Sequence, residues 1–77
     1  MYKVTYQAGK GFVDIIQVSV KNGESWELLK DRELVDRIEK KFMENGSSFK
    51  DRQKMGYGEA VYTEKLSYVT GKFEVVE

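Results

Sequence analysis

The segment 54–62, KMGYGEAVY, carries residue types with which a β-strand can stack the bases of a nucleic acid. Base-stacking strands place aromatic side chains two positions apart, so that successive rings lie on one face of the sheet. Tyr57 occupies the first such position, but Glu59 occupies the second, and a carboxylate neither stacks on a base nor attracts a phosphate. Tyr62 stands at an odd spacing from Tyr57, which points it to the opposite face of a regular strand. The segment is therefore predicted to be a core strand, entered through two glycines that permit unusual φ angles.

Three basic residues, Lys50, Arg52 and Lys54, precede this strand at spacing i, i+2 and i+4. In an extended chain they lie on one side and can contact phosphates or an acidic protein surface. A solvated loop is the simpler interpretation, since Asp51 interrupts the run. The whole chain carries 13 basic and 13 acidic residues, so its formal net charge of zero argues against a general polyanion-binding protein. Nucleic-acid binding through the basic 50–57 loop and the adjacent sheet is the alternative function.

Catalytic chemistry finds little support in the sequence. The chain contains neither cysteine nor histidine, which removes thiolate nucleophiles, the commonest general base and the commonest transition-metal ligands. Carboxylate pairs such as Asp31 and Glu33 stand among basic residues, where nothing suggests the burial that general acid–base catalysis requires. The glycine-rich Gly9-Lys10-Gly11 lacks the spacing of a phosphate-binding loop. The chain is expected to be non-catalytic, with no metal and no cofactor.

The aromatic residues are more numerous than one small core requires: five tyrosines, four phenylalanines and one tryptophan. Tyrosine and tryptophan are enriched at binding hot spots because they combine a large contact area with a polar tip. Trp26 follows a turn and lies off the main apolar arc of the predicted helix, so it is either an interface anchor or a satellite core contact beneath a loop. The candidate partner-binding residues are Trp26, Tyr57, Lys50, Arg52 and Lys54.

The elements that must position these residues begin with two strands. Residues 2–8 alternate between apolar and polar side chains, and residues 12–20 are rich in β-branched residues, so together they predict a hairpin. Apolar residues on both faces of 12–16 indicate either a strand covered twice or a bulge near Asp14. The alternation at the end of the second strand predicts that Ile16 points inward.

The dipeptide Asn22-Gly23 is typical of a hairpin turn. A strand directly after it would carry Trp26 and Leu28 on the same face as the polar Ser19, which the alternation of apolar and polar residues disfavours. A turn followed by a short helical segment over 25–29 is therefore predicted.

The remainder of the chain predicts one helix and two further strands. Residues 47–55 are expected to form a loop or a ragged edge strand, and strands follow at 58–68 and 72–77. The predicted fold class is α+β: a single domain of residues 1–77, in which an antiparallel sheet of about four strands (ββαββ) carries one main helix on one face. That helix, over 31–44, is predicted from apolar residues at helical spacing, which are Leu34, Val35, Ile38 and Phe42.

The location and the kind of function follow from these properties. No apolar run approaches the roughly 20 residues that a membrane helix needs, and the N-terminus lacks the apolar region of a signal peptide. With the absence of cysteine, this predicts a cytoplasmic chain with no membrane partner. The expected function is a small protein-binding module that acts on a larger protein complex as an inhibitor or adaptor; in size and character it resembles the small proteins of phages and other mobile elements. A homodimer formed through an edge strand or the uncovered sheet face would suit its size.

Overall fold

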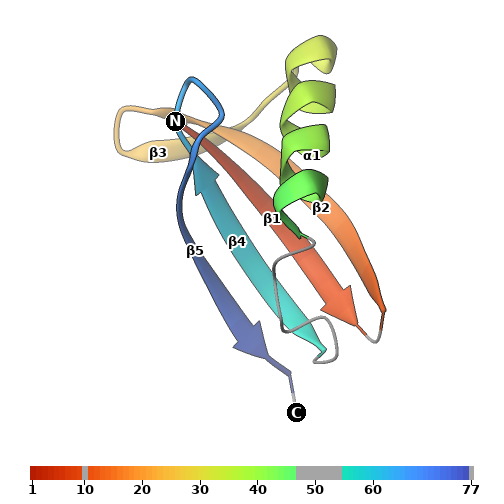
Figure 1. The fold of residues 1–77 in the computed structure, drawn as a ribbon. Helices are drawn as coiled ribbons and strands as arrows, with labels where there is room; N and C mark the ends of the chain where they lie inside the picture. The colour runs from red at the N-terminus through yellow and green to blue at the C-terminus, as the bar shows by residue number, and fades with distance from the viewer. Residues whose placement is uncertain (10, 47–54, 77) are drawn as a thin grey trace.

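The computed structural model describes residues 1–9, 11–46 and 55–76, which form one antiparallel sheet with a helix on one face (Figure 1). The predicted α+β class is confirmed, with five strands in place of about four. The strand order across the sheet is β3-β2-β1-β4-β5. In chain order the elements are β1 (Tyr2–Gly9), β2 (Phe12–Asn22), β3 (Ser25–Leu28), α1 (Arg32–Gly46), β4 (Gly56–Tyr62) and β5 (Tyr68–Val75).

β1 is the central strand, and its alternation defines the two faces of the sheet. It pairs in antiparallel fashion with β2 on one side and with β4 on the other. One set of alternating side chains is buried on the side of α1, and the intervening residues lie on the opposite face. We call the side of α1 the helix face and the opposite side the open face. The buried β1 residues are Tyr2, Val4, Tyr6 and Ala8.

α1 begins where the sequence predicts. Asp31 precedes the first helical residue, and its Oδ1 accepts the N–H of Leu34 at 3.3 Å, as an N-cap does. Ile38 and Phe42 are fully buried, and the ring centroids of Phe42 and Tyr6 lie 4.8 Å apart. Burying each such side chain contributes roughly 1.5–3 kcal/mol, which exceeds the difference in helix propensity between ordinary residues. Packing on the sheet therefore stabilises α1 more than its local sequence does.

A bulge in β2 resolves the two-faced apolar pattern of its first half. Thr5 pairs with Gln17 whereas Tyr6 pairs with Ile15, so Ile16 is an extra residue in the ladder. The prediction that Ile16 points inward is wrong: its side chain is 55% exposed. The irregularity lies two positions beyond the predicted one, and it keeps one side of β2 apolar along the whole strand. The residues that this places on the helix face are Val13, Ile15, Val18 and Val20.

The predicted helical segment over 25–29 is wrong, because the chain forms a second hairpin there. Asn22 pairs with Ser25 across a two-residue loop, and Gly23 occupies its first position with a φ of 64°. Such loops favour glycine where φ is positive. Trp26 and Leu28 consequently lie on the open face, together with Ser19. The sequence disfavoured this arrangement because both side chains are apolar. That expectation assumed a purely polar face, whereas the open face holds Trp26 between lysine side chains, as described below.

The two glycines at the start of β4 are explained by packing. Neither Gly56 nor Gly58 has a positive φ, so the predicted need for unusual backbone angles is wrong. The ring of Tyr6 lies directly over Gly58, where a Cβ would overlap it. That ring continues toward Phe73 on β5, at 6.3 Å between centroids. The predicted core position of Tyr62, at the end of this strand, is confirmed by its complete burial.

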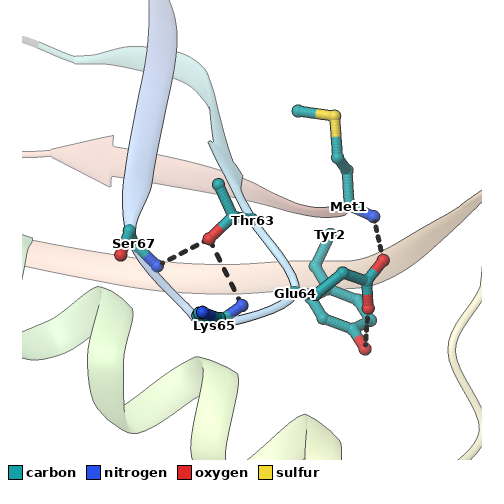
Figure 2. Close-up of polar contacts among 6 residues, drawn as sticks. All are labelled: Met1, Tyr2, Thr63, Glu64, Lys65 and Ser67. Carbon is teal, nitrogen blue, oxygen red and sulfur yellow. Dashed lines mark hydrogen bonds and ion pairs between the residues drawn. The ribbon is translucent and has the colours of Figure 1, made fainter.

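The loop between β4 and β5 is built around one hydroxyl group (Figure 2). Thr63 Oγ1 accepts the backbone N–H of Lys65 at 3.3 Å and that of Ser67 at 3.2 Å. Between them Leu66 has a φ of 61°, a left-handed conformation that is unfavourable for a residue with a side chain. The side chain of Leu66 packs against the edge of the core, and this contact compensates for the backbone strain.

Replacing Leu66 by glycine is expected to destabilise the protein less than replacing it by alanine. Both variants lose the leucine contacts, worth roughly 1–2 kcal/mol for a partly buried side chain. Glycine alone relieves the left-handed backbone, which is worth about 1 kcal/mol. Urea unfolding of both variants and the parent protein measures the free energies. An alanine variant as stable as the glycine variant would contradict the proposed balance.

Candidate partner-binding surface

Trp26 is the centre of a cluster on the open face. Its ring projects from β3, where Lys21 is its direct cross-strand neighbour on β2. Lys3 Nζ, from β1, lies 4.7 Å from the ring centroid, and Lys21 Nζ lies 5.9 Å from it. Ammonium groups at these distances attract the electron-rich face of an indole. Lys3 Nζ also lies 3.7 Å from Glu59 Oε1, so the cluster continues onto β4.

The environment of Trp26 lies between full exposure and core burial. The ring is half-buried, so it is not free in solvent, and it does not belong to the hydrophobic core. Lysine side chains, whose stems are apolar, provide part of its cover. The ring is therefore held in place on a surface that no second layer of the described structure covers (Figure 1).

Further large apolar side chains share the open face with Trp26. Leu28 follows it on β3 and is 57% exposed. At the other end of the sheet, Phe12 lies over Gly9 and is 46% exposed, and Tyr57 on β4 is 50% exposed. The open face therefore carries two apolar groups, Trp26 with Leu28 and Phe12 with Tyr57, which a polar sheet surface does not require for folding.

The two groups are well separated. Trp26 lies opposite Lys21, whose N–H donates to the carbonyl of Met1, whereas Tyr57 lies opposite Gln7. Residues 1 to 7 of an extended strand span roughly 20 Å. Trp26 and Tyr57 are thus on the same face but at opposite ends of it, and a partner that contacts both must be a large surface.

The sequence-predicted site is only partly brought together. Tyr57, expected in a loop with the basic run, lies instead within β4. The predicted residues Lys50, Arg52 and Lys54 fall outside the described residues. Sequence reasoning missed Phe12 and Leu28 because their exposure depends on the register of β2 and on the existence of β3. The i, i+2 spacing of Trp26 and Leu28 is the one signal that could have identified them.

Two hollows lie on or beside this surface. A depression of about 110 Å³ lies on the open face, and pockets for small ligands usually have volumes of roughly 300–1,000 Å³. A larger groove, about 380 Å³, runs between the β2 bulge, the end of β3 and the start of α1. Ile16 and Leu28 both line this groove, which therefore continues the apolar surface around the sheet edge. The residues that line the depression are Thr5, Tyr57, Gly58, Glu59, Lys72 and Glu74.

Two common features, a metal-binding cluster and a membrane-spanning helix, are absent from the described residues. Among residues 1–9, 11–46 and 55–76, no group of three or more side chains could hold a metal ion. Within the same residues, no helix has both the length and the apolar character that crossing a membrane requires. No protein-family model matches this chain, and neither a curated protein nor a solved structure matches it with significance.

One polar cluster beside the sheet has a structural role (Figure 2). Glu64 Oε1 accepts the N-terminal ammonium of Met1 at 2.6 Å, and Oε2 accepts the hydroxyl of Tyr2 at 3.0 Å. The bond from the ammonium group, followed by that from Tyr2, holds the pKa of Glu64 below its usual value. Burial, followed by the bond to Glu64, raises the pKa of the Tyr2 hydroxyl. The cluster fastens the start of β1 to the β4–β5 loop.

Because the folded protein lowers the pKa of Glu64, the ionised carboxylate adds to the free energy of unfolding, and this contribution is lost at acid pH. The contribution is fully present above the ordinary pKa of 4.5 and is lost as the pH falls through the lower, folded-state pKa. Glu64→Gln should therefore be less stable than the parent protein near about pH 7, and the difference should shrink toward about pH 3. Urea unfolding of both proteins across this range measures it. A difference that is independent of pH would contradict the assignment.

Truncation of Trp26 should leave the fold largely intact. Trp26→Ala removes a half-buried ring that lies outside the hydrophobic core, so its loss of unfolding free energy should stay below about 3 kcal/mol, the lower end for aromatic residues in a core. Phe42→Ala is the matched control, because Phe42 is fully buried and should lose roughly 3–5 kcal/mol. Guanidinium unfolding compares the two variants. Equal losses would assign Trp26 to the core.

Proposed function

We propose that this protein is a non-catalytic protein-binding module that docks its open face on a larger protein. The observation that carries the proposal is the pair Trp26 and Leu28, two large apolar side chains presented on an uncovered sheet face. Tryptophan is the residue most typical of interface hot spots. The lysines beside Trp26 restrict its motion before binding, so less conformational freedom is lost when a partner covers it.

The charges around the apolar groups favour a protein partner. Lys3 lies beside Glu59, and Lys72 Nζ lies 3.3 Å from Glu74 Oε1, so both signs of charge alternate across the open face. A mixed polar rim around a few apolar anchors is the usual anatomy of a protein–protein interface. Complementary charges on the partner would fix the orientation of the complex more than its affinity.

The alternative is a single-stranded nucleic acid. Trp26 with Lys3 and Lys21 supplies a ring for a base and cations for phosphates, the combination that single-strand-binding proteins use. The predicted basic residues Lys50, Arg52 and Lys54 would add to it. Protein binding ranks first because Glu59 and Glu74 share the same face and would repel a phosphate backbone.

The proposal includes a mode of action and a cellular setting. A chain that supplies a docking face and no reactive groups acts by occupying a surface of its partner, as an inhibitor or adaptor does. Small proteins of phages and other mobile elements act in this way, and the cysteine-free composition suits the cytoplasm in which they operate.

Affinity capture of the tagged, full-length chain from its native cells tests the function. We expect the parent protein to retain a specific protein with or without nuclease, and Trp26→Ala to lose it. Met43→Ala is the control, because Met43 is a large apolar side chain exposed on α1, away from the open face. Binding should then be reproduced with the purified partner.

Two outcomes would contradict the proposal. Equal retention by Trp26→Ala would remove the open face from the interaction. Capture that nuclease abolishes, combined with oligonucleotide binding that weakens steeply with salt, would establish the nucleic-acid alternative.

A further inference from the structure

The outer edge of β5 is an unpaired strand in the described structure. β5 is the last strand of the sheet and pairs with β4 on its inner side only. Such an edge presents a row of unpaired backbone N–H and C=O groups to another chain. Figure 1 shows β5 to one side of the helix, which packs over β1 and β2. Val69, Val75 and Val76 are exposed along this strand, and Phe73 is half-buried.

We propose that two copies of this chain pair through their β5 edges, in an antiparallel register centred on Phe73. The two sheets then form one continuous sheet across a two-fold axis. The hydrogen bonds of this interface come from the backbone of the β5 edge, whereas the side chains of Lys72 and Glu74 lie at the margin of the open face, at the opposite side of the sheet from Trp26 on β3.

The backbone directions of β5 limit the registers available. The N–H of Val76 donates to the carbonyl of Met55 at 2.9 Å, so Val76 turns its backbone groups toward β4. In an antiparallel ladder these directions alternate, and Lys72 and Glu74 therefore also turn inward. Gly71, Phe73 and Val75 turn their N–H and C=O groups outward. A second copy can bond only where outward residues face outward residues, which leaves registers centred on residues 71 to 75.

Charge selects one of these registers. Centring the pair on Lys72 or on Glu74 places two like charges directly opposite each other, which destabilises a strand pair. In a register centred on Phe73, Lys72 of each copy lies opposite Glu74 of the other, so the two-fold axis creates two such pairs. These are pairs without mutual backbone hydrogen bonds, in which the side chains approach most closely.

The remaining registers are excluded by shape. A register centred on Gly71 would lay the irregular end of β5, where the ladder with β4 shifts beside Val69, against Phe73 of the second copy. A register centred on Val75 pairs only the last few residues of the strand. In the Phe73-centred register the two Phe73 residues lie opposite each other with their rings turned inward over β4, and each exposed Val75 lies opposite Gly71, which has no side chain to obstruct it.

The charge pattern supplies a sharp test by sedimentation analysis over a wide concentration range. The parent protein should show a reversible monomer–dimer equilibrium. Lys72→Glu and Glu74→Lys should each weaken self-association by about tenfold or more, because each creates like charges across the two-fold axis. An equimolar mixture of the two variants should recover the dimer, because an edge with two glutamates then meets an edge with two lysines.

Controls separate this proposal from folding and from the open face. Lys72 and Glu74 side chains are about two-thirds exposed or more, so both variants should keep the circular dichroism spectrum of the parent. Glu27→Lys, a charge change on the opposite edge strand β3, should leave the dimer unchanged. A parent protein that stays monomeric throughout, or a mixture that fails to associate, would overturn the proposal. Partner capture through Trp26 would stand in either case.

Discussion

The ring of Tyr6 links the central strand β1 to the helix α1 and to the neighbouring strands β4 and β5. Tyr6 projects from the central strand, contacts Phe42 of α1, and extends over Gly58 of β4 to Phe73 of β5. Because side chains alternate along a strand, fixing Tyr6 on the helix face also fixes Lys3 and Thr5 on the open face. A shift of one residue would exchange the two faces. The same constraint that buries the core therefore decides which residues reach solvent.

A sheet of five strands is too wide for one helix to cover. α1 packs over β1 and β2, and β5 and the whole open face have no second layer in the part of the chain that the structure describes. Larger α+β domains bury such surfaces with further elements. The described residues therefore form one sheet-and-helix layer pair with two different kinds of exposed surface: side chains on the open face and backbone groups on the β5 edge.

The sequence predicted those features whose signal is local and repeated. The period of Tyr2, Val4 and Tyr6 identified β1, and the spacing of Ile38 and Phe42 with the cap at Asp31 identified α1. β3 was missed for a physical reason. Its four residues carry too short a pattern, and the inference that Trp26 avoids the Ser19 face ignored the attraction of lysine ammonium groups to an indole ring. The sequence also could not explain why position 58 is glycine, because the explanation is the Tyr6 ring, which comes from another strand and leaves no room for a Cβ. Of the candidate site, Trp26 and Tyr57 were named from the sequence, but their common face and their separation on it follow only from the strand register.

The position of Trp26 also has a spectroscopic consequence. It is the only tryptophan in the chain, and it lies on the open face, whereas Tyr2, Tyr6 and Tyr62 are buried in the core. Tryptophan emission therefore reports on the environment of the open face, whereas the tyrosine signal combines the three buried rings with the exposed Tyr57 and Tyr68. Because a single tryptophan marks the proposed docking surface, the emission of the native protein can follow docking there without any label.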